Sequence, residues 1–221
     1  MRPSQTVFRK VLNSCYSYDP LNSSALDTSN AIETIQLRLR LAASVSKATA
    51  DEQASTIAAA ADVVVRTFRG GGKLLLCGNG GSAADCQHMA AELLGRLNRQ
   101  TIRPGLPAIA LTTDTSFLTA HANDVSFDDV FARQVQALGS RGDALIAIST
   151  SGTSRNVLAA VEIARRNGVT VIALTGCDGL FTEVPVEVVV RVPSSDTQLI
   201  QQTHLSIEHL ICELVERTLY P

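Results

Sequence analysis

Residues 144–174 read ALIAISTSGTSRNVLAAVEIARRNGVTVIAL, and this stretch decides the fold. Apolar runs of strand length, 144–149 and 169–174, flank a segment at 154–167 whose apolar residues recur at helical spacing. Continuous apolar strands that alternate with helices are typical of a parallel sheet buried on both faces. The sequence therefore predicts a strand–helix–strand unit with a hydroxyl-rich turn after its first strand.

The same alternation extends to both sides of this unit. Further strands are expected at 73–78, 107–111 and 186–192, and further helices at 82–97, 127–138 and 197–219. Apolar residues at three- and four-residue steps from Ser29 to Phe68 predict two N-terminal helices, split near Ala48–Asp51. The fold class predicted is α/β, a three-layer sandwich with a five-stranded parallel sheet and an N-terminal helical pair.

We expect residues 1–28 to be a flexible extension and residues 29–221 to form a single domain, since 221 residues are too few for two full domains. A net charge of −2 gives no reason to expect nucleic acid as a partner. No apolar run approaches the roughly 20 residues that cross a bilayer, so no membrane is expected. Five cysteines without a CxxC pair indicate buried thiols of a cytoplasmic protein.

Two loops that follow predicted strands have unusual compositions. In CGNGGSAAD (77–85), Asn79, Gly80 and Gly81 permit a tight turn and Ser82 can start a helix. In STSGTS (149–154) the hydroxyls could surround a small anion, which the start of the next helix would also attract. Ligands of such sheets bind at the carboxyl ends of the strands, where both loops lie.

Each loop also has a simpler explanation. A glycine turn after a strand can serve chain geometry alone, and serines can cap a helix, although capping needs one hydroxyl rather than four. Neither loop fits the GxxxxGK[ST] or GxGxxG spacing of nucleotide-binding motifs. A small phosphate ester such as a phosphosugar fits the hydroxyl-rich turn better than a nucleotide does.

These two loops and LTTDTSFLTAHAND (111–124) together resemble the sugar isomerase (SIS) family, and within it the sedoheptulose 7-phosphate isomerases. QHMAAELLGR (87–96) and IQQTHLSIEH (200–209) also match, and the resemblance covers about 30–219. It implies the SIS fold and an aldose–ketose isomerase that converts D-sedoheptulose 7-phosphate to D-glycero-D-manno-heptose 7-phosphate by enediol proton transfer. It further implies a cytoplasmic homotetramer with active sites at subunit interfaces.

The resemblance also assigns roles to particular residues. It implies that Glu92 and His209 form the acid–base pair. The phosphate ligands it implies are Ser149, Thr150, Ser151 and Ser154. The other implied substrate contacts are Asn79, Gly80, Gly81, Ser82, Glu92, Thr113, Asp114 and Gln201. One zinc ion per subunit would be held by His88, Glu92, Gln201 and His209.

The chemistry is compatible with these residue types, because a carboxylate can move a carbon-bound proton and an imidazole a hydroxyl proton. His88 and Glu92 are four residues apart and share a helix face, although such pairs are common on solvated helices. On the last helix, Gln201 shares a stripe with His204 and Glu208, whereas His209 lies about 80° away. Spacing alone therefore favours His204 or Glu208, and His209 rests on the resemblance.

The chain departs from the family's usual pattern at Leu199, where Arg is usual, at Leu180, where Gly is usual, and at Thr153, where Asn is usual. His121 is expected to be a packed or interface histidine rather than a ligand. A non-catalytic SIS protein, such as one that associates with the bacterial replication initiator, is the alternative function. The presence of both Glu92 and His209 favours the isomerase.

Overall fold

The computed structural model describes residues 27–221, with residues 99 and 181 left out. The chain divides into two compact units, Met1–Arg40 and Leu41–Pro221. Helix α2 spans Thr28–Arg69. At its start, the Asp27 carboxylate accepts the backbone N–H of Ser29 at 3.1 Å. The predicted extension at 1–28 lies almost wholly outside the described residues.

The predicted break near Ala48–Asp51 is wrong, because α2 continues through these residues without interruption. Neither glycine nor proline occurs there to end a helix. Lys47 Nζ lies 2.9 Å from Asp51 Oδ2 one turn later, and the Thr49 hydroxyl donates to the carbonyl of Val45 at 2.8 Å. One long helix therefore replaces the expected helical pair.

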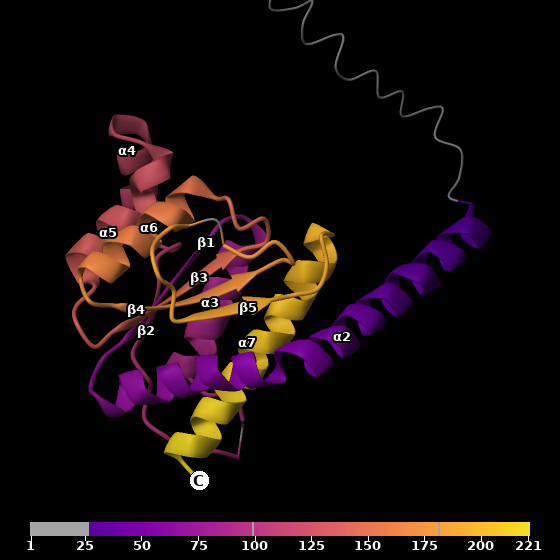
Figure 1. Cartoon of the computed structure of the whole chain (residues 1–221), viewed down its shortest axis with the longest axis horizontal. Helices are drawn as coiled ribbons and strands as arrows, with labels where there is room; N and C mark the ends of the chain where they lie inside the picture. Colours follow the sequence, from indigo (N-terminus) through magenta and orange to yellow (C-terminus); the bar gives the residue numbers. More distant parts are fainter. Residues whose placement is uncertain (1–26, 99, 181) are drawn as a thin grey trace, which may run out of the picture. The chain divides into compact units, whose positions relative to one another are not determined.

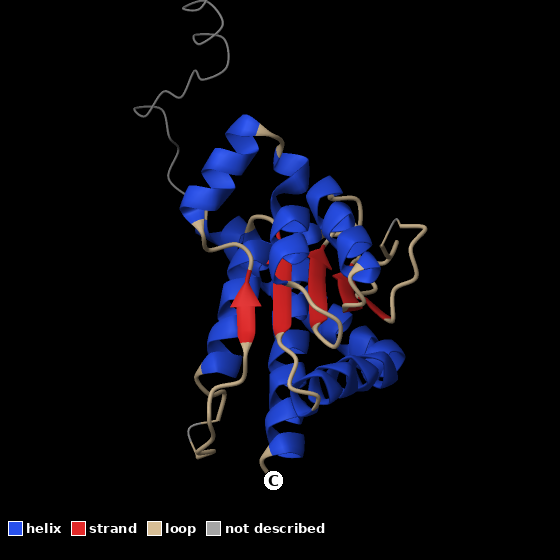
Figure 2. Ribbon diagram, turned by 90° about the vertical axis from the view of Figure 1, so that its left-hand side faces the viewer, coloured by secondary structure: helices blue, strands red, loops and turns tan. Residues whose placement is uncertain are grey.

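The predicted five-stranded parallel sheet is confirmed in the part of the chain described. Its strands are β1 (Leu74–Gly78), β2 (Ala108–Ala110), β3 (Ala144–Ser149), β4 (Thr170–Thr175) and β5 (Val188–Arg191). All neighbouring pairs are parallel, in the order β2-β1-β3-β4-β5, and Figure 2 shows the arrows pointing the same way. The chain leaves β1 towards one edge and β3 towards the other, so their carboxyl ends form the switch point at which such sheets bind ligands.

Helices cover both faces of this sheet and complete the three layers. One face carries α3 (Gly81–Leu94), α7 (Thr197–Leu219) and the second half of α2, and the other carries α4 (Thr115–Asp124), α5 (Val130–Leu138) and α6 (Arg155–Arg166). Figure 1 shows α5 and α6 together on their side of the strands. Successive strand residues point to opposite faces of the sheet. Leu74 and Leu76 belong to the first apolar cluster, on the side of α3 and α7, and Leu75 and Cys77 belong to the second apolar cluster, on the side of α5 and α6.

Helix α4 was not among the predicted helices, and a short 3-10 helix, η1 (Phe127–Asp129), precedes α5 where one helix was expected. Among the described cysteines, Cys77, Cys86 and Cys212 are buried thiols and Cys177 is an exposed one. No helix within the described part of the chain is long and apolar enough to cross a membrane.

Candidate active site

The glycine turn and the hydroxyl turn lie side by side because they follow neighbouring strands. Gly78 at the end of β1 pairs with Ile148 near the end of β3. Gly80 has a φ of 55°, which a residue without Cβ adopts at little cost, and α3 begins immediately after it. Gly152 in the second turn has a φ of 69°. Both turns thus open at the carboxyl edge of the sheet, as expected for the binding site.

A reciprocal pair of amides connects the two turns. Asn79 Nδ2 donates to Asn156 Oδ1 at 2.8 Å, and Asn156 Nδ2 donates to Asn79 Oδ1 at 2.8 Å. Asn156 lies in the first turn of α6 and is only 3% exposed. Sequence analysis did not single out Asn156, because its partner is 77 residues away in the chain.

The hydroxyls of the second turn mainly contact one another. Ser149 Oγ donates to Ser154 Oγ at 3.1 Å, and the hydroxyls of Ser151 and Thr153 lie 3.0 Å apart. Ser154 is the N-cap residue of α6, but its side chain makes no capping hydrogen bond. Capping therefore does not account for these hydroxyls.

A cavity of about 300 Å³ lies beside this turn, and three loops at the carboxyl edge of the sheet form its wall. Thr150, Ser151 and Thr153 line it on one side. Loops after β4 and β5 complete it with Gly176, Cys177, Asp178, Ser194 and Ser195, together with Thr197 and Ile200 of α7. Its wall is rich in hydroxyl groups, as a site for a phosphate or a sugar requires.

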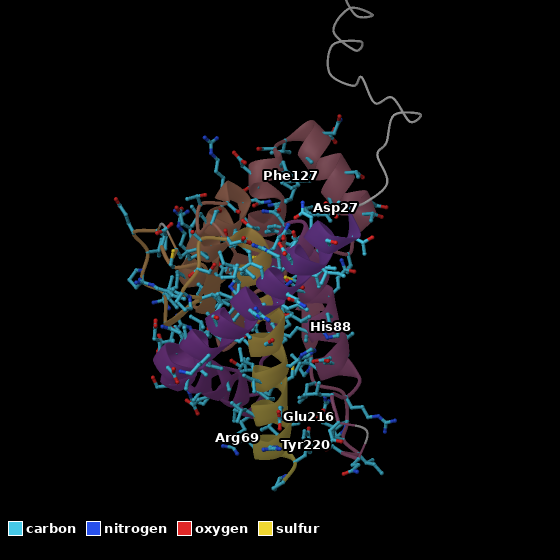
Figure 3. All side chains as sticks on the ribbon, turned by 90° about the vertical axis from the view of Figure 1, so that its right-hand side faces the viewer. Asp27, Arg69, His88, Phe127, Glu216 and Tyr220 are labelled. Atoms are coloured by element: carbon cyan, nitrogen blue, oxygen red, sulfur yellow. The ribbon has the colours of Figure 1, made fainter. Side chains whose placement is uncertain are left out.

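A second group of polar side chains lies between α3 and α7. His88 Nε2 lies 3.2 Å from Glu92 Oε1 and 2.9 Å from His209 Nε2, and His209 Nε2 lies 3.4 Å from the same Glu92 oxygen. The two imidazoles meet edge to face, with ring centroids 5.1 Å apart. Figure 3 labels His88 on α3, beside α7.

This three-residue cluster combines features of an acid–base pair and of a metal site. Two imidazole nitrogens at 2.9 Å require a proton or a cation between them, because two lone pairs repel. The potential ligand atoms of His88, Glu92 and His209 all lie within 4.8 Å of one another. Glu92 Oε2 is buried, whereas Glu92 Oε1 faces both imidazoles.

Gln201, one of the predicted ligands, packs against the start of α3. Its Nε2 donates to Asp85 Oδ1 at 3.4 Å, which leaves its carbonyl oxygen for another partner. A Cβ added at Gly81 would come within 2.6 Å of Gln201 Cδ, so the side chain of Gln201 would have to move if this position carried a larger residue. Burial raises the pKa of Asp85, while the Gln201 hydrogen bond and nearby His88 lower it by less.

His204 and Glu208, the residues favoured by helical spacing, lie in the interior and outside the three-residue cluster. Both are fully buried. His204 Nε2 lies 3.1 Å from the carbonyl oxygen of Thr175, and burial lowers the pKa of His204 to about 4, so this imidazole is a neutral donor. Burial, reinforced by the charges of Asp85 and Glu92, raises the pKa of Glu208 to about 9.

A buried ion pair holds the end of α3 against α7, and the sequence did not reveal it. Arg103 Nε lies 2.8 Å from Glu216 Oε1, and Arg103 Nη2 donates to the backbone carbonyl of Glu92 at 2.8 Å. Glu216 also accepts the backbone N–H of Leu97 at 2.9 Å. Burial favours the neutral carboxyl of Glu216, but the Leu97 and Arg103 hydrogen bonds outweigh it and lower the pKa.

The predicted residues after β2 have local structural partners. Asp114 caps α4 by accepting the backbone N–H of Phe117 at 2.9 Å, and Thr113 donates to the carbonyl of Ala110 at 3.1 Å. His121 stacks on the Phe117 ring with centroids 5.0 Å apart, in line with a packed histidine.

The two leucines that depart from the family pattern serve packing. Leu199 is buried at the start of α7, where its backbone N–H bonds to Asp196, and Leu180 packs against the second apolar cluster.

Known proteins resemble this chain in sequence and in fold. The SIS domain family model matches residues 39–176, and the chain is 54% identical over 176 residues to the phosphoheptose isomerase of Roseiflexus sp. (strain RS-1), which covers 80% of this chain and 88% of that relative. The chain belongs to the SIS domain family. A second SIS relative, the phosphoheptose isomerase of Geobacter sulfurreducens, is 49% identical over 190 residues, 86% of this chain and all of the relative.

Among solved SIS structures, phosphoheptose isomerase GmhA from Neisseria gonorrhoeae is 39% identical, with a TM-score of 0.79 over 85% of this chain and 99% of that one. The expected SIS fold and the resemblance to this family are confirmed. The alternative of a non-catalytic SIS protein is not favoured by these relatives.

Proposed function

We propose that the chain catalyses the isomerisation of D-sedoheptulose 7-phosphate to D-glycero-D-manno-heptose 7-phosphate through an enediol. The observation that carries this proposal is the meeting of Glu92 of α3 and His209 of α7, which come from helices distant in sequence and lie 3.4 Å apart. Relatives called phosphoheptose isomerases, about 50% identical over most of their length, support the same reaction.

In this proposal Glu92 is the base that removes the carbon-bound proton and returns it to the neighbouring carbon. Its side chain is only 14% exposed, so it is shielded from bulk water. The His209 imidazole moves the hydroxyl proton or stabilises the negative oxygen of the enediolate. Asn79, Gly80, Gly81, Ser82, Thr113, Asp114 and Gln201 would contact the sugar.

The phosphate end would bind at the hydroxyl turn. Ser149, Thr150, Ser151 and Ser154 offer hydroxyls, and the start of α6 adds a partial positive charge that favours an anion. The cavity of about 300 Å³ lined by Thr150 and Ser151 gives room for a small phosphate ester.

The three-residue cluster also suits a zinc ion, since imidazole nitrogens and a carboxylate oxygen are common zinc ligands. His88, Glu92 and His209 would hold it together with Gln201, whose carbonyl oxygen is not used by the bond to Asp85. When bound, one zinc per subunit would polarise the substrate carbonyl.

We also propose that the enzyme works in the cytoplasm as a homotetramer. His88 and His209 are 47% and 43% exposed at the side chain, so the three-residue cluster is open on one side to a second copy of the chain. Leu94 of α3 and Leu210 and Leu214 of α7 are exposed apolar side chains that such a contact would cover. Light scattering gives the mass of the assembly.

The decisive experiment incubates the purified protein with sedoheptulose 7-phosphate, with and without a chelator, and follows the product by NMR. We expect the heptose aldose phosphate to appear, and loss of activity with the chelator if zinc takes part. Absence of product under both conditions, with zinc resupplied, refutes the proposed reaction.

Variants test the roles of the individual residues. Glu92→Gln and His209→Asn should abolish turnover while inorganic phosphate still binds. Glu162→Gln, on the exposed face of α6, is the matched control and should keep wild-type activity. A near-normal rate in either of the first two variants shows that the acid–base assignment is wrong.

A further inference from the structure

Asn156 has no role in the reaction proposed above, yet its environment is unusually specific. Its side chain is 3% exposed, and it exchanges two hydrogen bonds of 2.8 Å with Asn79. A primary amide offers two donors and one carbonyl oxygen, so each partner uses one donor and one acceptor and retains an N–H for other contacts. Among the standard side chains of this length, only an amide can both donate and accept in this way.

The pair joins two segments that bind opposite ends of the proposed substrate. Asn79 belongs to the glycine turn after β1, which would hold the sugar, and Asn156 comes two residues after Ser154 of the hydroxyl turn. Both turns follow interior strands that pair from Leu74↔Ala144 to Gly78↔Ile148, so their starting points are fixed. Beyond the strand ends, the amide pair is the direct side-chain link found between the described residues of the two turns.

We propose that Asn156 is a positioning residue, which fixes the glycine turn relative to the hydroxyl turn and thereby sets where the reacting carbons lie over Glu92. This inference rests on the proposed function, because it requires the sugar at one turn and the phosphate at the other. A substrate held at both ends is misplaced when the separation of the turns changes, and an error of about 1 Å can lower the rate about 100-fold.

The two ends of the site can be probed separately. Inorganic phosphate contacts only the hydroxyl turn, so its binding does not depend on the separation of the turns. Asn156→Ala should therefore lower kcat/KM for the sugar phosphate about 10- to 100-fold, with the larger part in kcat, and change the inhibition constant of inorganic phosphate less than about 2-fold. Disruption of the fold around α6 would weaken phosphate inhibition as well.

The experiment measures both quantities in wild type, Asn156→Ala, Asn79→Ala and the double variant. If Asn156 acts through Asn79, the double variant is no slower than the slower single variant. The matched control is Asn167→Ala at the other end of α6, whose side chain reaches only the carbonyls of Val135 and Gly139 at 3.5 and 3.4 Å. It should retain wild-type kinetics.

Three results overturn the inference: kcat/KM of Asn156→Ala within about 3-fold of wild type, a parallel loss of phosphate inhibition, or fully additive effects of the two substitutions. If Asn156→Ala is not recovered folded, Asn156→Ser is measured with the same criteria. An inactive wild type contradicts the proposed reaction, whereas an active wild type with an equally active Asn156→Ala variant contradicts only the role of Asn156.

Discussion

Acid should destabilise the protein through one buried imidazole, that of His204. This side chain is fully buried, and its Nε2 donates to the carbonyl of Thr175 at 3.1 Å. Burial lowers the pKa of His204 from 6.5 to about 4. As the pH falls, this imidazole is therefore protonated in the unfolded chain before it is protonated in the folded protein. Between these two pKa values the unfolded state binds more protons, and the free energy of unfolding falls as the pH falls.

The magnitude follows from the two pKa values. At about 1.4 kcal/mol per pKa unit, the gap between 6.5 and about 4 corresponds to about 3 kcal/mol. Because the imidazole is fully buried, solvent screening does not reduce this figure. The contribution is complete above pH 6.5 and is lost progressively on the way to pH 4.

The assay is urea-induced unfolding of wild type and His204→Gln at several pH values from 7 to 4, at one protein concentration and with a chelator present. Glutamine keeps an N–H for the Thr175 carbonyl but does not titrate. The stability of wild type relative to the variant should therefore decrease by about 3 kcal/mol across this range. A difference that stays constant to within about 0.5 kcal/mol would refute the reasoning.

Three further substitutions test other parts of the structure. Burial and two neighbouring carboxylates raise the pKa of Glu208 to about 9, so the stability of wild type relative to Glu208→Gln should fall as the pH rises from about 5 to 9; a difference that does not change with pH in chelator would contradict this. Arg103→Met leaves the buried carboxylate of Glu216 unpaired and should lower the free energy of unfolding in urea by about 3–5 kcal/mol, whereas a loss below about 1 kcal/mol would show that the pair is dispensable. Gly81→Ala places a Cβ within 2.6 Å of Gln201 Cδ and should lower kcat/KM at least about tenfold with phosphate inhibition unchanged; wild-type kinetics would show that Gln201 moves aside harmlessly.

The sheet could be predicted because each of its strands is a short, nearly continuous apolar run, as burial on both faces requires. Helix α4 could not be predicted in the same way, because none of its residues is buried and it has only a weak apolar face. The Asp114 cap was the signal that could have found it. The predicted break in α2 near Ala48–Asp51 was wrong because this segment holds only alanine, threonine and aspartate, all of which are compatible with a helix.

The site was only partly accessible to sequence reasoning. The spacing on α7 pointed to His204 and Glu208, but this stripe faces the interior because α7 packs on the sheet, while His209 faces α3. Asn156 and Arg103 escaped notice because their partners lie 77 and 113 residues away, and spacing arguments work only within one element.

The two outermost strands, β2 and β5, are the shortest of the five described, with three and four residues. The backbone N–H of Arg191 in β5 already donates to Gln53 Oε1 at 3.3 Å. The two edge strands therefore leave few unpaired backbone N–H and C=O groups. This limits pairing with a strand of another molecule and so protects the open sheet against aggregation. Helices rather than sheet edges therefore offer the larger surface through which copies of this chain can associate.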